Sequence, residues 1–222
     1  MLRILASLCL ASGAALLLWG CSSTPYFVAE REPWREAEEQ ACLASNVVQE
    51  TRFVQARSAL GGPSVCGALR PFEMAATSDG RVGLKPSALL RCPMVPAVEH
   101  WLRTAVEPAA RMYLGAPIVE VKVAASYGCR PMNHQVGGRL SEHGHANALD
   151  VAAFVTADGR VVNVKDGWRG ERHEQAFLRA VHSGACHTFT TVLGPEYDAL
   201  HRDHFHVDLA KRGANGMGRV CK

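Results

Sequence analysis

Apolar residues recur at helical spacing in two long segments of the chain. The first segment is 97–114, where the apolar side chains fall mostly on one stripe. Pro108 should kink or interrupt this helix, because proline lacks the N–H that a helix interior needs. The second segment is 171–183, with Phe177 facing inward. Weaker patterns predict helical segments over 46–60 and over 86–90.

Alternating apolar and polar positions predict strands, mainly in the second half of the chain. Residues 118–127 alternate, as in a half-buried strand. Two apolar runs, 149–155 and 160–164, flank an Asp158-Gly159 turn and predict a hairpin. Shorter strands are expected over 190–193 and 204–209. Together the patterns predict an α+β fold, with helices in the N-terminal half and a small antiparallel sheet.

The N-terminus has the pattern of an export signal. Arg3 precedes an apolar run that ends at Trp19, and residues 1–20 are therefore interpreted as a signal peptide. The sequence before Cys21 resembles a bacterial lipobox, which predicts lipidation of Cys21 and anchoring to a membrane by acyl chains. Ser22 is typical of outer-membrane sorting, so we expect a periplasm-facing outer-membrane lipoprotein of a Gram-negative bacterium. An ordinary signal peptide with an incidental Cys21 is the alternative.

Composition narrows the class of protein. The 222 residues are 48% hydrophobic and 20% charged, enough for one medium domain or two small ones. We divide the chain into the signal peptide, a polar tether over 21–40 and a domain over 41–222. The net charge of +3 and the 7% aromatic content argue against nucleic acid as a partner. No pattern indicates an oligomeric state.

Eight cysteines point to an oxidising compartment. Cys9 would leave with the signal and Cys21 would carry lipid. Six cysteines then remain, an even number that predicts three disulfides in an exported domain. Their 15 possible connectivities stay open at this point. The six are Cys42, Cys66, Cys92, Cys129, Cys186 and Cys221.

The histidines are clustered. Nine of the ten lie between His134 and His206, mainly in the segments 141–150 and 201–208. Residues two apart on a strand share a face, so His204 and His206 would project together, with Asp208 further along. A catalytic zinc site needs three ligands from His, Asp or Glu and one open position. His143, Asp150 and one of the two strand histidines supply that set.

These clusters resemble the signature of the LAS metallopeptidases, which include D-alanyl-D-alanine carboxypeptidases, murein endopeptidase and the zinc fold of hedgehog domains. In that signature, Ser-x-His and Ala-x-Asp are followed later by His-x-His; here Ala146 stands where glycine is usual. More closely, the chain resembles the bacterial extensin-like C-terminal domain family over 42–221. The supporting segments are 126–130, 140–143, 148–151, 191–195 and 204–208.

The resemblance implies a Zn²⁺ site with ligands His143, Asp150 and His206. It also implies a water molecule, activated by zinc, that attacks a peptide carbonyl. His204 and His201 match the base and transition-state partners of the murein endopeptidase branch. Asp203, which replaces the glutamate of the carboxypeptidase branch, would orient His204 or substitute as base.

Two further residues are candidates for substrate binding. Arg130 suits a substrate carboxylate or carbonyl, and Ser141 could contact substrate or cap a turn. The resemblance gives His145 no role.

Three hypotheses follow. The first is a zinc-dependent hydrolase that cleaves peptide bonds in peptidoglycan, as an endopeptidase or a carboxypeptidase on cross-link peptides. The second is a catalytically inactive zinc-containing domain that binds wall peptide or a protein partner. The third is a disulfide-bonded structural domain without metal.

Overall fold

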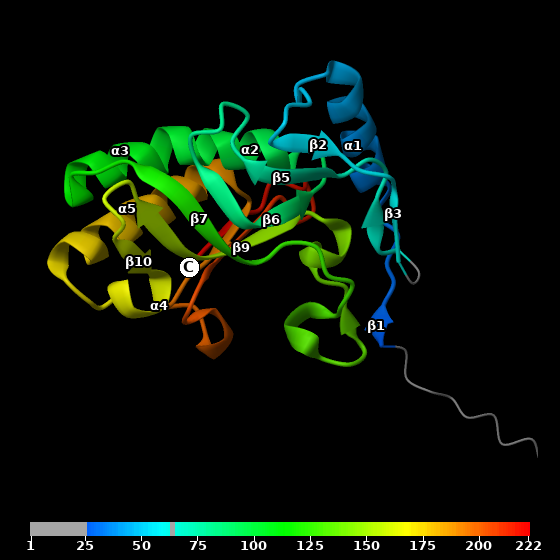
Figure 1. Ribbon diagram of the computed structural model, residues 1–222. Helices are drawn as coiled ribbons and strands as arrows, with labels where there is room; N and C mark the ends of the chain where they lie inside the picture. The colour runs from blue at the N-terminus through cyan, green and yellow to red at the C-terminus, as the bar shows by residue number, and fades with distance from the viewer. Residues whose placement is uncertain (1–25, 63–64) are drawn as a thin grey trace, which may run out of the picture.

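The computed structural model describes residues 26–62 and 65–222 (Figure 1). Residues 1–20, which are interpreted as a signal peptide, and Cys21 lie outside the described residues. Within the described part of the chain, no helix has both the length and the apolar character needed to cross a membrane.

A mixed sheet forms the centre of the molecule. Its strands run in the order β13-β11-β12-β9-β7-β6-β5-β2, and β10 pairs with β9. Most neighbours are antiparallel, but β6 and β7, and also β11 and β13, are parallel. The expected small antiparallel sheet is therefore larger and mixed. The strands are β2 (Val54–Ala56), β5 (Phe72–Ala76), β6 (Gly83–Leu90), β7 (Ile118–Ala125), β9 (Ala148–Thr156), β10 (Val161–Asn163), β11 (Thr191–Leu193), β12 (Phe205–Asp208) and β13 (Val220–Cys221).

Two short strand pairs lie outside this sheet. β1 (Phe27–Val28) pairs in parallel with β8 (Gly138–Arg139). β3 (Leu60–Gly61) pairs with β4 (Gly67–Ala68).

The long helix predicted over 97–114 is confirmed, as a continuous run from 94 to 114 that changes its winding. α2 (Met94–Trp101) is followed by a π-helical turn η1 (Leu102–Val106), a short α3 (Glu107–Ala109) and a second π-helical turn η2 (Ala110–Leu114). Pro108 lies between the two wide turns, so its missing N–H is accommodated by a local change of winding rather than by a break.

The second long helix is also confirmed. α5 (Arg172–Thr188) follows the short α4 (Val164–Gly167) and extends five residues beyond the predicted end. It packs beside α2 and α3 on one face of the sheet (Figure 1). The core beneath these helices contains an aromatic cluster of Trp101, Phe154, Phe177 and Phe189, whose rings meet edge to face. The Trp101 indole donates to the Val181 carbonyl at 3.0 Å, so its buried N–H is satisfied.

Two predicted helices are wrong. Residues 46–60 contain the strand β2, because Asn46 adopts left-handed backbone angles and ends α1 (Pro33–Ser45). Residues 86–90 belong to β6, where Ala88 and Leu90 are buried in the sheet. A short apolar run is as compatible with a buried strand as with a helix, and here sheet pairing decides. Helices are therefore not confined to the N-terminal half, since α5 lies in the other.

The expected tether is partly structured. α1 begins at Pro33, inside the segment 21–40, and Pro33 occupies the first helical turn, where its missing N–H costs nothing. Figure 1 shows α1 at the edge of the molecule near β2 and β3.

Three disulfides connect the described residues, as the cysteine count predicts. Cys42 pairs with Cys92, Cys66 with Cys129, and Cys186 with Cys221. The first fastens α1 to the end of β6. The second fastens the loop after β7, and the third fastens β13 to α5.

Candidate metal centre

Pairing of β9 with β12 places two of the candidate ligands directly opposite each other. His206 on β12 lies opposite Asp150 on β9 in the antiparallel register. Alternate residues of these strands, including Val207 and Leu149, enter the helix-covered core. Asp150 and His206 therefore project from the other face of the sheet.

The third candidate ligand comes from the turn that leads into β9. Residues Glu142–His145 form a short 3₁₀ turn, η4, which carries His143 over the polar face of the sheet. Ser141 caps this turn by accepting a bond from the His143 amide at 3.4 Å. Ala146 then adopts left-handed angles, with φ 50°, and redirects the chain into β9.

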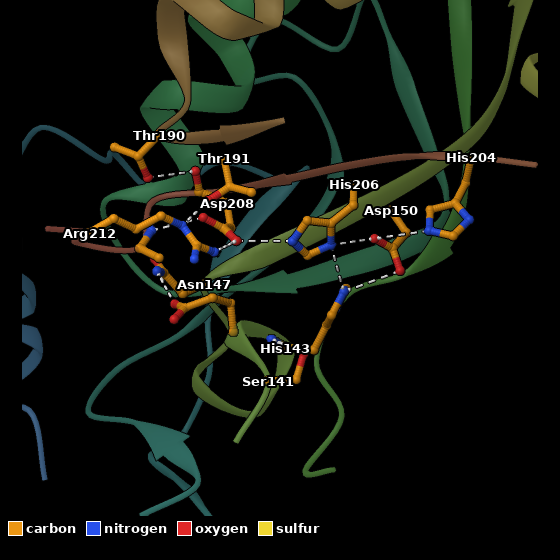
Figure 2. A network of polar contacts seen from close by, with 12 residues as sticks. Ser141, His143, Asn147, Asp150, Thr190, Thr191, His204, His206, Asp208 and Arg212 are labelled. Atoms are coloured by element: carbon orange, nitrogen blue, oxygen red, sulfur yellow. Dashed lines mark hydrogen bonds and ion pairs between the residues drawn. The ribbon is translucent and has the colours of Figure 1, made fainter. Parts of the chain in front are cut away.

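The three side chains converge on one point (Figure 2). His143 Nε2 lies 3.2 Å from His206 Nδ1 and 3.2 Å from Asp150 Oδ2. His206 Nδ1 lies 2.9 Å from Asp150 Oδ1. All three residues are buried.

Each histidine presents a defined nitrogen to that point. His143 Nδ1 donates to the backbone carbonyl of Ser126, which leaves Nε2 directed at the carboxylate of Asp150. His206 Nε2 donates to Asp208 at 3.0 Å, which leaves Nδ1 directed inward. A carbonyl oxygen can only accept, so His143 Nδ1 carries a hydrogen.

This geometry fits a tetrahedral metal. Ligand atoms about 2.0–2.1 Å from a zinc ion lie roughly 3.3–3.4 Å apart at tetrahedral angles. The three contacts above, at 2.9 to 3.2 Å, are close to this spacing. Two histidines and one carboxylate also match the donor set of catalytic zinc sites. Asp208 supplies the outer carboxylate that commonly orients a ligating histidine.

Charge is concentrated at the centre. Burial alone would lower the pKa of His206, but its hydrogen bonds to Asp150 and Asp208 outweigh burial and raise that pKa to about 9. Burial alone would raise the pKa of Asp150, but the two histidines hold it well below its usual range. The pKa of Asp208 is lowered by His206 in the same way.

Asp208 belongs to a wider network. The Ala210 amide donates to Asp208 at 2.9 Å, and Arg212 lies 3.7 Å from its other oxygen. Arg212 in turn donates to the Thr191 hydroxyl at 2.7 Å (Figure 2). Asp208 is fully buried, so these donors compensate its loss of water.

The candidate bases lie beside the ligands in the same cleft. His204 precedes β12, which begins one residue later than predicted, and its Nε2 lies 3.7 Å from Asp150 Oδ1. Asp203 accepts from His204 Nδ1 at 2.8 Å, and its own side chain is 65% exposed. Asp203 therefore lies where it can orient His204.

His201 is the second candidate base. Its ring centre lies 5.3 Å from that of His204 and 6.0 Å from that of His206. Asp198 binds His201 Nδ1 at 2.7 Å, and burial outweighs this carboxylate and lowers the pKa of His201. His201 is thus held as a neutral side chain near neutral pH.

The two candidate substrate-binding residues line the same cleft, together with Met132, Tyr197 and Leu200. Ser141 is buried, and its hydroxyl serves as the cap of η4, which is the alternative that the sequence left open. His145, on the opposite side of η4, faces Arg35 rather than this cleft; burial and that guanidinium lower its pKa to about 4.

A second group with metal-ligand spacing occurs in the described residues. It comprises His182, Cys186 and Cys221. Both cysteine sulfurs are bonded to each other, so they are not thiolates that could bind a metal.

Sequence reasoning missed the residues that support the ligands. Strand alternation correctly predicted that Asp208 shares a face of the strand with His206, but it did not predict that Asp208 binds the His206 ring. Asp198 stands three residues before His201, as a capping aspartate would. Arg212 and Thr191 carry no local signal, because only the folded sheet brings them to Asp208.

Comparison with known proteins adds the family. No curated protein and no solved structure matches the chain. The sequence profile described as Extensin-like protein C-terminus matches residues 40–222, which is most of the chain and includes every residue of the centre. The chain therefore belongs to the family of extensin-like protein C-termini.

Proposed function

We propose that this chain is a zinc-dependent hydrolase that cleaves peptide bonds in peptidoglycan cross-links. One observation carries the proposal. Two histidine rings are fixed by outer acceptors so that their inner nitrogens meet one carboxylate, in a cleft that also holds His201 and His204. A structural zinc site would be closed by a fourth protein ligand, whereas this set of three leaves a position open.

The residues of the chain would divide the reaction as follows. Bound zinc would supply a Lewis acid that lowers the pKa of water and polarises a carbonyl. His204, oriented by Asp203, would accept a proton from the attacking water at Nε2. The same nitrogen would deliver that proton to the amine as the peptide C–N bond breaks. His201, whose Nδ1–H is bound by Asp198, would present its unprotonated Nε2 as a second acceptor for the proton of the attacking water, and Arg130 would hold a substrate carboxylate.

Two measurements test the proposal together. Elemental analysis of purified protein should find about one zinc per chain, lost in His143→Ala and Asp150→Ala. Purified cross-linked muropeptides should be cleaved, as followed by mass spectrometry, and a chelator should stop the cleavage. His173→Ala, on the exposed surface of α5, is the matched histidine control and should retain both zinc and activity. Zinc-loaded protein that leaves every muropeptide intact would exclude the hydrolase.

One observation favours a second candidate, a zinc-containing module that binds wall peptide without cleaving it. Asp203 points its carboxylate to His204 and to solvent, so it does not act on the centre directly. Equal muropeptide affinity of wild type and His204→Ala, with no turnover by either, would support this module.

We also propose that lipid on Cys21 anchors the protein to the outer membrane. The lipobox-like sequence before Cys21 supports this placement. Metabolic labelling with a fatty acid should mark the wild type and not Cys21→Ala. Membrane fractionation of the two forms should show the same difference.

A further inference from the structure

An N-terminal arm, residues 26–39, precedes the family-matched segment yet contacts the chain on both sides of Ser141. Its strand β1 pairs with β8, with Phe27 opposite Gly138 and Val28 opposite Arg139. The Gly137 amide adds a bond to the Tyr26 carbonyl at 3.0 Å. Figure 1 shows β1 and α1 at the same edge of the molecule.

The second contact of the arm reaches the turn that carries His143. Arg35 on α1 forms two parallel bonds with Glu142, at 2.6 and 2.5 Å. Both side chains are nearly buried, at 12% and 10% exposure, so solvent screens this pair little. Glu32 binds the remaining edge of the guanidinium at 2.6 Å and fixes its orientation.

Glu142 transmits that contact to the whole turn. Its carboxylate also accepts from the Asn147 side chain at 2.6 Å, and its carbonyl accepts from the Asn147 amide at 3.0 Å. These bonds close the turn from 142 to 147 around His143. Glu142 is bonded in sequence to His143, so a change in its position moves the ligand.

The turn needs such support, because Ala146 holds an uncommon conformation. Its φ of 50° lies in the left-handed region, which is unfavourable for a residue with a Cβ. Backbone of this kind persists where surrounding contacts over-determine it. The Arg35–Glu142–Asn147 chain of bonds supplies part of those contacts, and the Arg91 amide adds a bond to the Ala146 carbonyl at 2.8 Å.

We infer that Arg35 is a positioning residue of the metal centre. Acting through Glu142, it holds η4 so that His143 Nε2 meets Asp150 and His206. The arm is thus part of the frame of the site, although it lies outside the segment that defines the family. The metal-binding part of this inference rests on the proposed function.

The test compares variants of the full chain at both ends of the pair. Arg35→Met removes the guanidinium and keeps the length of the side chain, Glu142→Gln keeps the shape, and a double variant combines them. Glu38→Gln is the matched control, because it breaks an α1 ion pair with Lys211 that does not touch η4. Arg35→Lys keeps the charge and loses the two-pronged bond, which guards against variants that fail to fold.

Zinc affinity is the first readout, by competition with a chromophoric chelator. Arg35→Met and Glu142→Gln should each raise the dissociation constant about 10–100-fold, as loss of an outer partner typically does. The double variant should bind zinc no more weakly than the weaker-binding of the two single variants. The dissociation constant of Arg35→Lys should lie between those of wild type and Arg35→Met. The absorption bands of cobalt-substituted Arg35→Met should shift, and those of Glu38→Gln should not. Wild-type affinity in folded Arg35→Met would overturn the inference.

Hydrogen exchange of the metal-free protein is the second readout. Amides of residues 144–147 should lose protection in Arg35→Met and keep it in Glu38→Gln. A wild type that binds no zinc would defeat the proposed function, and hydrogen exchange would still decide the role of Arg35. Unchanged protection would overturn that role whether or not zinc binds.

Discussion

His206 is held at both ring nitrogens by carboxylates, Asp150 at Nδ1 and Asp208 at Nε2. The two contacts have different consequences. Asp150 lies on the side of the ring where a metal would bind, whereas Asp208 holds the ring through the opposite nitrogen, Nε2. A buried imidazole between two carboxylates is also where a proton is most strongly retained when the metal is absent.

Replacement of Asp208 by Asn should separate these effects. The outer hydrogen bond would become neutral, so we expect zinc affinity to fall about 10–100-fold. In metal-free protein, the pKa of His206 should fall below about 9, because one of the two charges that raise it is gone. NMR titration of the His206 ring measures the shift. Asp203→Asn, which changes the partner of His204 only, is the control; an unshifted His206 in Asp208→Asn would contradict the assignment.

The raised pKa of His206 gives metal-free protein a defined pH dependence. The pKa rises from 6.5 to about 9 on folding, so protonated His206 contributes stability fully below pH 6.5. That contribution is lost as pH rises through about 9. Urea unfolding in excess chelator should therefore show a fall in stability between pH 6.5 and 9, and His206→Gln should reduce the slope. Parallel curves for the two proteins would show that His206 is not the group responsible.

At the scale of elements, the turn η4 shows the backbone conformation at Ala146, the position where the zinc-peptidase signature that the sequence resembles has glycine. Ala146 occupies a left-handed position that glycine adopts without penalty. Its methyl group is fully buried, which offsets part of the backbone cost.

Ala146→Gly should therefore change stability little, by less than about 1 kcal/mol. Relief of roughly 1–2 kcal/mol of backbone strain is opposed by loss of a buried methyl and by a more flexible unfolded chain. Ala146→Val adds a β-branched side chain to the same strained backbone and should cost more than about 2 kcal/mol. Chemical denaturation compares the two, and equal destabilisation would show that backbone conformation does not limit this position.

Elements with a clear period were predictable from sequence, and short ones were not. The alternation in β7, the Asp-Gly turn between β9 and β10, and the stripe of α5 each specify their structure locally. Residues 86–90 of β6 were wrongly predicted to be helical because Ala88-Leu89-Leu90 suits a helix or a strand. The strands that decide between the two, β5 and β7, lie elsewhere in the chain. The three candidate ligands were predicted from their spacing and from the family resemblance, and the fold brings the side chains of His143, Asp150 and His206 together. Arg35 could not be found, because it lies in no motif and its partner Glu142, at the middle position of Ser-x-His, is 107 residues away.

At the scale of the whole molecule, the disulfides connect different segments that surround the central sheet. Cys66–Cys129 closes a span of 63 residues and holds the loop beside the cleft. In that loop, the Gly128 amide donates to the His143 carbonyl at 3.1 Å. Cys186–Cys221 closes 35 residues and lies at the edge strand β13 of the sheet.

Removal of either bridge should lower the free energy of unfolding by a similar amount. The two removals should differ in their effect on zinc affinity. Each double Cys→Ser variant should lose about 2–4 kcal/mol, since loop entropy depends only weakly on length. Zinc affinity should fall in Cys66→Ser/Cys129→Ser and stay near wild type in Cys186→Ser/Cys221→Ser. Urea unfolding and chelator competition measure the two quantities. Equal loss of zinc affinity in both variants would mean that the loop at Cys129 has no special part in the centre.

The opposition of Asp150 and His206 across β9 and β12 also orders events during assembly. These residues are 56 positions apart in the chain, and His143 and His206 are 63 apart. Their donor atoms become neighbours only after the two strands have paired, so an unfolded chain offers no comparable chelate. A metal ion would then bind after folding and stabilise the native state. At a free ion concentration 100 times the dissociation constant, binding would add about 2.7 kcal/mol to the free energy of unfolding.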